Sequence, residues 1–213
     1  MPAYPHARFL LSALDLAQLA PYEGAEVALA GRSNAGKSST LNALVGASLA
    51  KASKTPGRTR AINLFAIEPG CYLADLPGYG YARMPEAMAK RLQGLMAQYL
   101  ARRPTLRGLI LVMDIRHPLK ASDWQLLERA RRRGLPVRVL LNKRDKLSRS
   151  QAVRVLRAVE AELAGIPGAA VQLFSARTGE GVEETRKAIE GFWQKKAPVR
   201  GNRGKQTRLG DAG

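Results

Sequence analysis

Residues 31–40, GRSNAGKSST, lie between an apolar, strand-like run and a helix-like segment. Within this stretch Gly31, Gly36, Lys37 and Ser38 have the spacing G-x-x-x-x-G-K-[ST] of a phosphate-binding loop. The glycines permit backbone conformations in which successive N–H groups point inward, and the helix that begins at Lys37 adds its positive dipole end. Lys37 supplies a charge for the β and γ phosphates, and Ser38 offers a hydroxyl to Mg²⁺. The stretch therefore predicts a nucleotide site where a strand meets a helix.

Strand-like apolar runs alternate with helical patterns through most of the chain. We expect strands at 26–30, 61–68, 71–76, 108–115, 136–142 and 170–175, and helices at 37–45, 86–101, 121–133, 149–164 and 181–195. The strands on either side of Pro69 and Gly70 are predicted to form a hairpin, which makes the sheet mixed. Strands rich in Val, Ile and Leu on both faces indicate a sheet covered by helices on two sides. The expected fold class is a three-layer α/β domain.

The composition indicates one globular domain with a large excess of positive charge. The 213 residues are 46% hydrophobic and carry 35 Lys and Arg against 17 Asp and Glu, a net charge of +18. This charge favours a polyanionic partner; the alternative is that many arginines only coat solvated helix faces. Cys71 is the only cysteine, which excludes an intramolecular disulfide and fits a reducing cytoplasm. No apolar stretch is long enough to cross a bilayer, so we expect no membrane partner.

The ends of the chain differ from its centre. The segment FLLSALDLAQLA (9–20) resembles a signal sequence, but Asp15 interrupts it and no cleavage site with a basic leader accompanies it. We interpret it as a short surface helix within an N-terminal extension, residues 1–24. Residues 196–213 are rich in Gly and basic residues with almost nothing to bury, so they are predicted to be a flexible basic tail.

The motif DLPG (75–78) follows a strand downstream of the phosphate loop. Asp75 is expected to hold Mg²⁺ through water, and the Gly78 amide is expected to bond the γ phosphate and so sense its presence. Alone, D-x-x-G is a common turn. Its place at a strand end after a phosphate loop makes the nucleotide interpretation strong.

The motif NKRD (142–145) decides the identity of the base. Guanine presents N1–H and an exocyclic amine as donors, which the Asp145 carboxylate can accept together, whereas adenine lacks this donor pair. Asn142 is expected to bond the N7 and O6 side and to tie this loop to the phosphate loop, while the Lys143 stem lies over the base. In FSAR (174–177), the backbone N–H of Ala176 is placed to bond guanine O6. The alternative, a solvated charged turn, leaves these spacings unexplained.

Together these motifs resemble those of P-loop GTPases, and GRSNAGKSS, KTPGRT, INLF, DLPGYGYA, MDIRHPLK and NKRDKL resemble the EngB family of bacterial ribosome-assembly GTPases. The resemblance covers about residues 9–195. It implies a Ras-like fold with a six-stranded, mostly parallel sheet and one antiparallel strand. It also implies a cytoplasmic GTP-hydrolysing switch that acts on the large ribosomal subunit precursor and its rRNA. We expect a monomer whose GTPase domain spans residues 25–195.

Resemblance to related GTPases also implies roles in hydrolysis. Thr59, rather than Thr55, is expected to complete the Mg²⁺ shell when the γ phosphate is present, within a switch loop at 46–60. Many signalling GTPases have a water-orienting glutamine where this chain has Tyr79, so intrinsic hydrolysis should be slow. Asn34 is expected to hold K⁺ beside the phosphates, and the alternative is that it only shapes the loop.

The expected site residues follow from these motifs and from the resemblance. Those expected to bind GTP or GDP are Gly31, Arg32, Ser33, Asn34, Ala35, Gly36, Lys37, Ser38, Ser39, Gly57, Thr59, Asp75, Gly78, Asn142, Lys143, Asp145, Ser175 and Ala176. The expected Mg²⁺ ligands are Ser38, Thr59 and Asp75, and the expected catalytic residues are Lys37, Asn34 and Thr59.

Two other functions remain open from the sequence. The chain could be a regulatory GTPase that steers a protein or membrane partner, although no acylation motif or amphipathic anchor favours a membrane. It could also be mainly an RNA-binding protein in which the nucleotide is structural. The aromatic residues form no stacking stripe of the kind that single-strand binders use, which weakens this second option.

Overall fold

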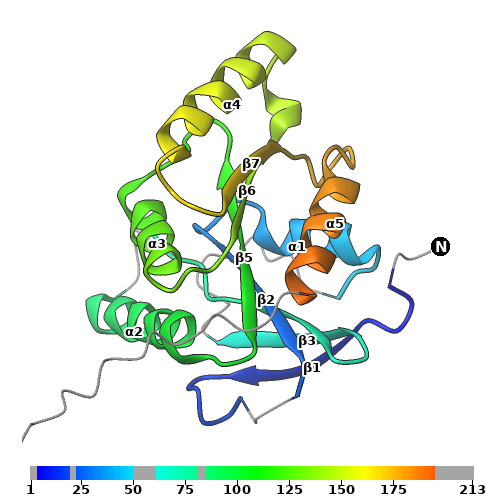
Figure 1. Cartoon of the computed structure of the whole chain (residues 1–213), viewed down its shortest axis with the longest axis vertical. Coiled ribbons are helices and arrows are strands. Elements are labelled where there is room, and N and C mark those ends of the chain that lie inside the picture. The colour runs from blue at the N-terminus through cyan, green and yellow to red at the C-terminus, as the bar shows by residue number, and fades with distance from the viewer. Residues whose placement is uncertain (1–3, 20–22, 50–60, 81–84, 195–213) are drawn as a thin grey trace, which may run out of the picture.

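A seven-stranded sheet forms the centre of the computed structural model, which describes residues 4–19, 23–49, 61–80 and 85–194 (Figure 1). The strand order is β1-β3-β4-β2-β5-β6-β7. Within these residues β3 alone runs in the direction opposite to the other strands. The strands are β1 (Arg8–Ala13), β2 (Ala25–Gly31), β3 (Ile62–Glu68), β4 (Cys71–Asp75), β5 (Leu106–Asp114), β6 (Val137–Asn142) and β7 (Ala169–Leu173).

Helices cover both faces of the sheet and create two hydrophobic cores (Figure 1). One core contains buried residues of α2 (Glu86–Arg102), α3 (Ala121–Arg132) and α4 (Arg149–Leu163). The other contains buried residues of α1 (Lys37–Val45) and α5 (Val182–Trp193). Strand β2 is buried along its whole length because it lies between both layers. The predicted three-layer α/β architecture is confirmed, including the β3–β4 hairpin. Among the described residues, no helix is long and apolar enough to cross a membrane.

The N-terminal segment corrects one prediction. Residues 8–13 form the edge strand β1, antiparallel to β3, and not the surface helix that their apolar pattern suggested. A helix satisfies its own backbone hydrogen bonds, whereas an edge strand needs a partner strand. The open edge of β3 provides that partner, and this tertiary pairing overrides the local propensity of the segment. The sheet therefore has seven strands where six were expected, while the single antiparallel strand agrees with expectation. The division of the chain at residue 24 stays a prediction.

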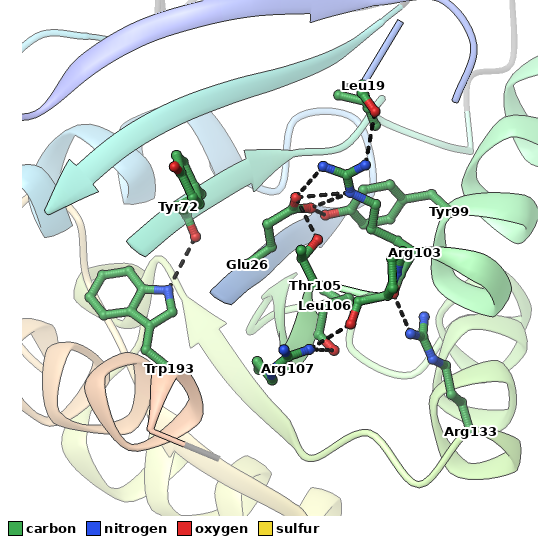
Figure 2. Close-up of polar contacts among 11 residues, drawn as sticks. Leu19, Glu26, Tyr72, Tyr99, Arg103, Thr105, Leu106, Arg107, Arg133 and Trp193 are labelled. Carbon is green, nitrogen blue, oxygen red and sulfur yellow. Dashed lines mark hydrogen bonds and ion pairs between the residues drawn. The ribbon is translucent and has the colours of Figure 1, made fainter. Parts of the chain in front are cut away.

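A buried polar network fixes the end of the sheet at which β2 begins (Figure 2). Glu26 is fully buried, and its carboxylate accepts hydrogen bonds from the Arg103 guanidinium, the Tyr99 hydroxyl (2.8 Å) and the Thr105 hydroxyl (2.7 Å). Arg103 also donates to the Leu19 carbonyl oxygen at 3.0 Å. A buried carboxylate is tolerated when it is paired and hydrogen-bonded in this way. The network joins β2 to the turn between α2 and β5.

Candidate nucleotide-binding site

The phosphate loop spans the carboxyl end of β2 and the start of α1, as predicted. Asn34 (φ 63°) and Gly36 (φ 94°) both have left-handed backbone conformations, which glycine and asparagine tolerate best. A Cβ atom on Gly36 would lie 2.3 Å from the Asn142 side-chain nitrogen, and one on Gly31 would lie 2.6 Å from the Val112 carbonyl oxygen. The two glycines of the motif are thus required by close approach to the loop after β6 and to β5.

Lys37 and Asp75 meet at this end of the sheet. The Lys37 ammonium forms an ion pair with the Asp75 carboxylate, and the two residues are only 8% and 2% exposed. Parallel pairing of β2 with β4 places Asp75 opposite Leu29, two residues before the loop begins. Ser38 is partly buried next to Lys37 in the first turn of α1, whereas Ser39 is exposed.

The side-chain oxygen atoms of Ser38 and Asp75 suit a Mg²⁺ ion that is shared with a nucleotide. A carboxylate and a hydroxyl are the hard oxygen ligands that Mg²⁺ prefers, and the ion usually takes its remaining ligands from phosphates and water. Among the described residues, no three His, Cys, Asp or Glu side chains gather to hold a metal by themselves. Ser38 and Asp75 therefore suit a metal that arrives together with phosphate oxygens.

Asn142 joins three loops at the carboxyl ends of β2, β6 and β7. Its side-chain nitrogen donates to the Ala35 carbonyl oxygen at 2.8 Å, and its side-chain oxygen accepts from the Ala176 backbone N–H at 3.3 Å. Lys143, with φ 64°, donates from its ammonium to the Asn34 carbonyl oxygen at 2.6 Å. The predicted tie between the NKRD loop and the phosphate loop is therefore present in the structure.

Asp145 presents an ionised carboxylate beside these loops. The Ser175 hydroxyl donates to it at 2.8 Å, and the Arg177 guanidinium lies 3.7 Å from its other oxygen. The hydrogen bond from Ser175 lowers the pKa of Asp145 below its ordinary value. Ser175 is itself buried, and its hydroxyl orients the Asp145 carboxylate through this hydrogen bond. A charged acceptor with a fixed orientation suits the paired N–H donors of guanine.

Asp114, at the end of β5, belongs to the site but was missed by the sequence reasoning. Its carboxylate accepts from Arg116 and lies 3.0 Å from the Lys143 ammonium. Although partial burial acts to raise it, hydrogen bonds from Arg116 and Lys143 hold the pKa of Asp114 well below its usual range. The available signal was its position at the carboxyl end of a central parallel strand, where ligands of such sheets bind.

The segment around Gly78 packs between the phosphate loop and α3. The Tyr79 carbonyl oxygen accepts from the Ser33 backbone N–H at 2.8 Å, and Arg32 and Tyr79 form an isolated parallel bridge. The Tyr79 hydroxyl donates to Asp123 of α3 at 2.7 Å. Burial raises the pKa of Tyr79 well above its ordinary value, so the hydroxyl keeps its proton. The side chain at the glutamine position of signalling GTPases is thus buried against α3.

Hydrogen bonds and an ion pair join the phosphate loop to Asp75, to the segment after Gly78 and to the NKRD loop, which contacts the FSAR loop in turn; none of these contacts involves Ser39. Gly57 and Thr59 lie outside the described residues, as do the basic tail and most of the predicted switch loop. The roles of the site residues in binding GTP, Mg²⁺ and K⁺ stay predictions.

The phosphate loop, the DLPG segment and the NKRD loop lie together at the carboxyl ends of the parallel strands. This arrangement defines a P-loop GTPase. The model of a family described as 50S ribosome-binding GTPase matches residues 26–143. The chain is 51% identical to a probable GTP-binding protein EngB from Stenotrophomonas maltophilia, over 87% of this chain and 94% of that one. It is 46% identical to the EngB protein of Coxiella burnetii, over 92% and 97% of the two chains. The chain therefore belongs to the EngB family of GTP-binding proteins.

Solved structures confirm the fold. A crystal structure of a probable GTP-binding protein EngB aligns with a TM-score of 0.65 and 23% identity, over 79% of this chain and 98% of that chain. Era, solved in complex with MgGDPNP and nucleotides 1506–1542 of 16S ribosomal RNA, aligns with a TM-score of 0.64 and 22% identity, over 84% of this chain and 60% of Era.

Proposed function

We propose that this GTPase acts as a monomeric, cytoplasmic switch in assembly of the large ribosomal subunit. In this cycle the GTP-bound form docks on precursor rRNA, and hydrolysis to GDP releases it. The observation that carries the ribosomal part is the match to a family described as 50S ribosome-binding GTPase. Era, a relative in fold, was solved with ribosomal RNA, and the net charge of +18 suits a polyanionic partner.

In the proposed mechanism, the site residues bind and orient GTP. When GTP binds, the Lys37 ammonium leaves the Asp75 carboxylate and pairs with the β and γ phosphates. The N–H groups of the phosphate loop and of the start of α1 donate hydrogen bonds to the phosphate oxygens. Asp145 accepts the two guanine donors, and Asn142 holds the base loop against the phosphate loop. Ser38, Thr59 and, through water, Asp75 would hold Mg²⁺, which would supply positive charge to the phosphates when bound.

Asn34 is proposed to bring K⁺ to the phosphates. Its side chain is exposed at the loop surface, while its carbonyl oxygen is engaged by Lys143. Because φ is 63°, a change to alanine would also strain the loop, so Asn34→Gly is the sharper test. We expect this variant to bind GTP but to lose stimulation by KCl relative to NaCl at equal ionic strength. If wild type hydrolyses GTP equally fast in both salts, the K⁺ proposal is wrong and the asparagine only shapes the loop.

Helix α4, at the top of Figure 1, is the proposed contact for RNA phosphates. Arg149, Arg154 and Arg157 are exposed on α4, and none of them forms an ion pair with another described residue. On α3, by contrast, Arg131 and Arg132 both pair with Glu128, at 2.7 and 2.9 Å. These three arginines outnumber the two exposed acidic residues of α4, Glu160 and Glu162, and are available to neutralise phosphates and release their counterions.

Co-sedimentation with large-subunit particles tests this function. Binding should be stronger with GTP or a non-hydrolysable analogue than with GDP. A plot of the logarithm of affinity against the logarithm of salt concentration should have a negative slope, with a magnitude of about 0.7 to 0.9 for each phosphate neutralised. Arg154→Ala with Arg157→Ala should reduce this slope by about 1.4 to 1.8. Arg131→Ala with Arg132→Ala removes the same charge but should change the slope less, because these two arginines are paired with Glu128. Salt-independent binding, or equal effects of the two pairs, would refute the α4 contact.

A further inference from the structure

The tie between Tyr79 and Asp123 connects the γ-phosphate sensor to α3. Tyr79 immediately follows Gly78, and its hydroxyl lies 2.7 Å from the Asp123 carboxylate. The two residues are 6% and 1% exposed, so the bond is shielded from water. A hydrogen bond to a buried carboxylate is stronger than one between neutral groups, and its loss leaves the acceptor unsatisfied.

Tyr79, the residue that follows Gly78, is held from both sides. On one side the Ser33 N–H of the phosphate loop donates to the Tyr79 carbonyl oxygen at 2.8 Å. On the other side Tyr79 is anchored to Asp123, which is fixed in turn because it accepts from the Lys120 N–H at 2.9 Å as part of the cap of α3. The position of the Gly78 amide thus depends on both the loop and the helix.

We propose that Asp123 is a positioning residue for GTP: through the Tyr79 hydroxyl, it holds the Gly78 amide where the terminal phosphate of GTP is bound. This inference rests on the proposed role of Gly78 as a ligand of the γ phosphate. Because GDP lacks that phosphate, the tie should strengthen binding of GTP without strengthening binding of GDP. A purely structural tie would lower protein stability and affect both nucleotides equally.

The chain offers a matched control for the test. Tyr99 is also buried, and its hydroxyl donates to a buried carboxylate, that of Glu26, at 2.8 Å. Glu26 lies where β2 begins, at the end of the sheet away from the phosphate loop. Tyr79→Phe and Tyr99→Phe therefore delete the same chemical group, a buried hydroxyl that donates to a buried carboxylate, but only the first lies beside the sensor.

Fluorescent GTP and GDP analogues measure the two affinities of each variant. Tyr79→Phe should weaken GTP binding by about 5- to 20-fold and change GDP binding less than about twofold, a coupling of ordinary size between linked sites. Tyr99→Phe should leave the ratio of GTP to GDP affinity at its wild-type value. Thermal unfolding of both variants shows whether the losses of stability are comparable.

A double-mutant cycle tests whether Asp123 acts through Tyr79. Asp123→Ala and Tyr79→Phe should each lower the affinity ratio, and the double variant should lower it no further, because each removes the hydrogen bond between these two side chains. An unchanged ratio in Tyr79→Phe, an equal change in Tyr99→Phe, or additive effects in the cycle would overturn the inference. Failure of wild type to prefer GTP over ATP would instead refute the nucleotide assignment itself.

Discussion

The Glu26 network supports a quantitative prediction about stability. Glu26→Gln removes the negative charge that faces Arg103, whose side chain is 7% exposed, and leaves the guanidinium without its counter-charge. Breaking a buried ion pair on one side costs about 3–5 kcal/mol. A domain of ordinary stability has about 5–15 kcal/mol in total, so this loss is a large fraction of the free energy of unfolding.

Urea unfolding measures this loss directly. With a denaturant slope of about 3 kcal/mol per molar, the midpoint of Glu26→Gln should fall by about 1 to 2 M with the slope unchanged. The Tyr99→Phe variant keeps the charge pair and should fall by less, because it loses one hydrogen bond to a charged group. GTP affinity of the folded protein should be retained, since the network lies where β2 begins and the phosphate loop lies where it ends.

Removing both charges separates the ion pair from simple loss of packing. Glu26→Gln combined with Arg103→Met removes both charges and keeps a side-chain oxygen that can accept from the Tyr99 or Thr105 hydroxyl, which should restore part of the lost stability. The reasoning would be refuted if Glu26→Gln lost less than about 1 kcal/mol, below the range for an uncompensated buried charge. It would also be refuted if the double variant were less stable than the single one.

Three further predictions concern the site and the tail. Asp145→Ala should reduce discrimination of GTP against ATP from about 10⁴-fold to near unity, measured by competition binding; a retained preference would show that another group reads the base. Because the folded-state pKa of Asp114 is lowered, its stabilisation should be present above the ordinary carboxyl pKa and be lost as pH falls through the lower folded value. Asp114→Asn should therefore flatten the acid limb of the stability curve, and an identical limb would contradict this account. Deleting residues 196–213 should weaken binding to large-subunit particles while sparing GTP binding, and unchanged affinity would assign the tail no role in docking.

The local features of this protein follow from short stretches of its chain. The phosphate loop, the DLPG segment and the NKRD loop each lie within a few consecutive residues, so their spacing encodes their chemistry directly. The alternation of apolar runs with helical patterns was sufficient to predict the layers and the order of the elements that follow β1. Asn142 could be linked to the phosphate loop because the carboxyl ends of parallel strands meet at one edge of a sheet.

Interactions between residues far apart in the chain arise only when the elements pack together. The edge strand β1 exists because β3 offers it an open edge, which no local pattern announces. Tyr79 and Asp123 are 44 residues apart, and Glu26 and Arg103 are 77 residues apart. Buried charges and hydroxyls choose whichever partner the packed elements bring within hydrogen-bonding distance, because leaving them unpaired is costly. Their partners are therefore a property of the assembled layers and not of any single stretch of the chain.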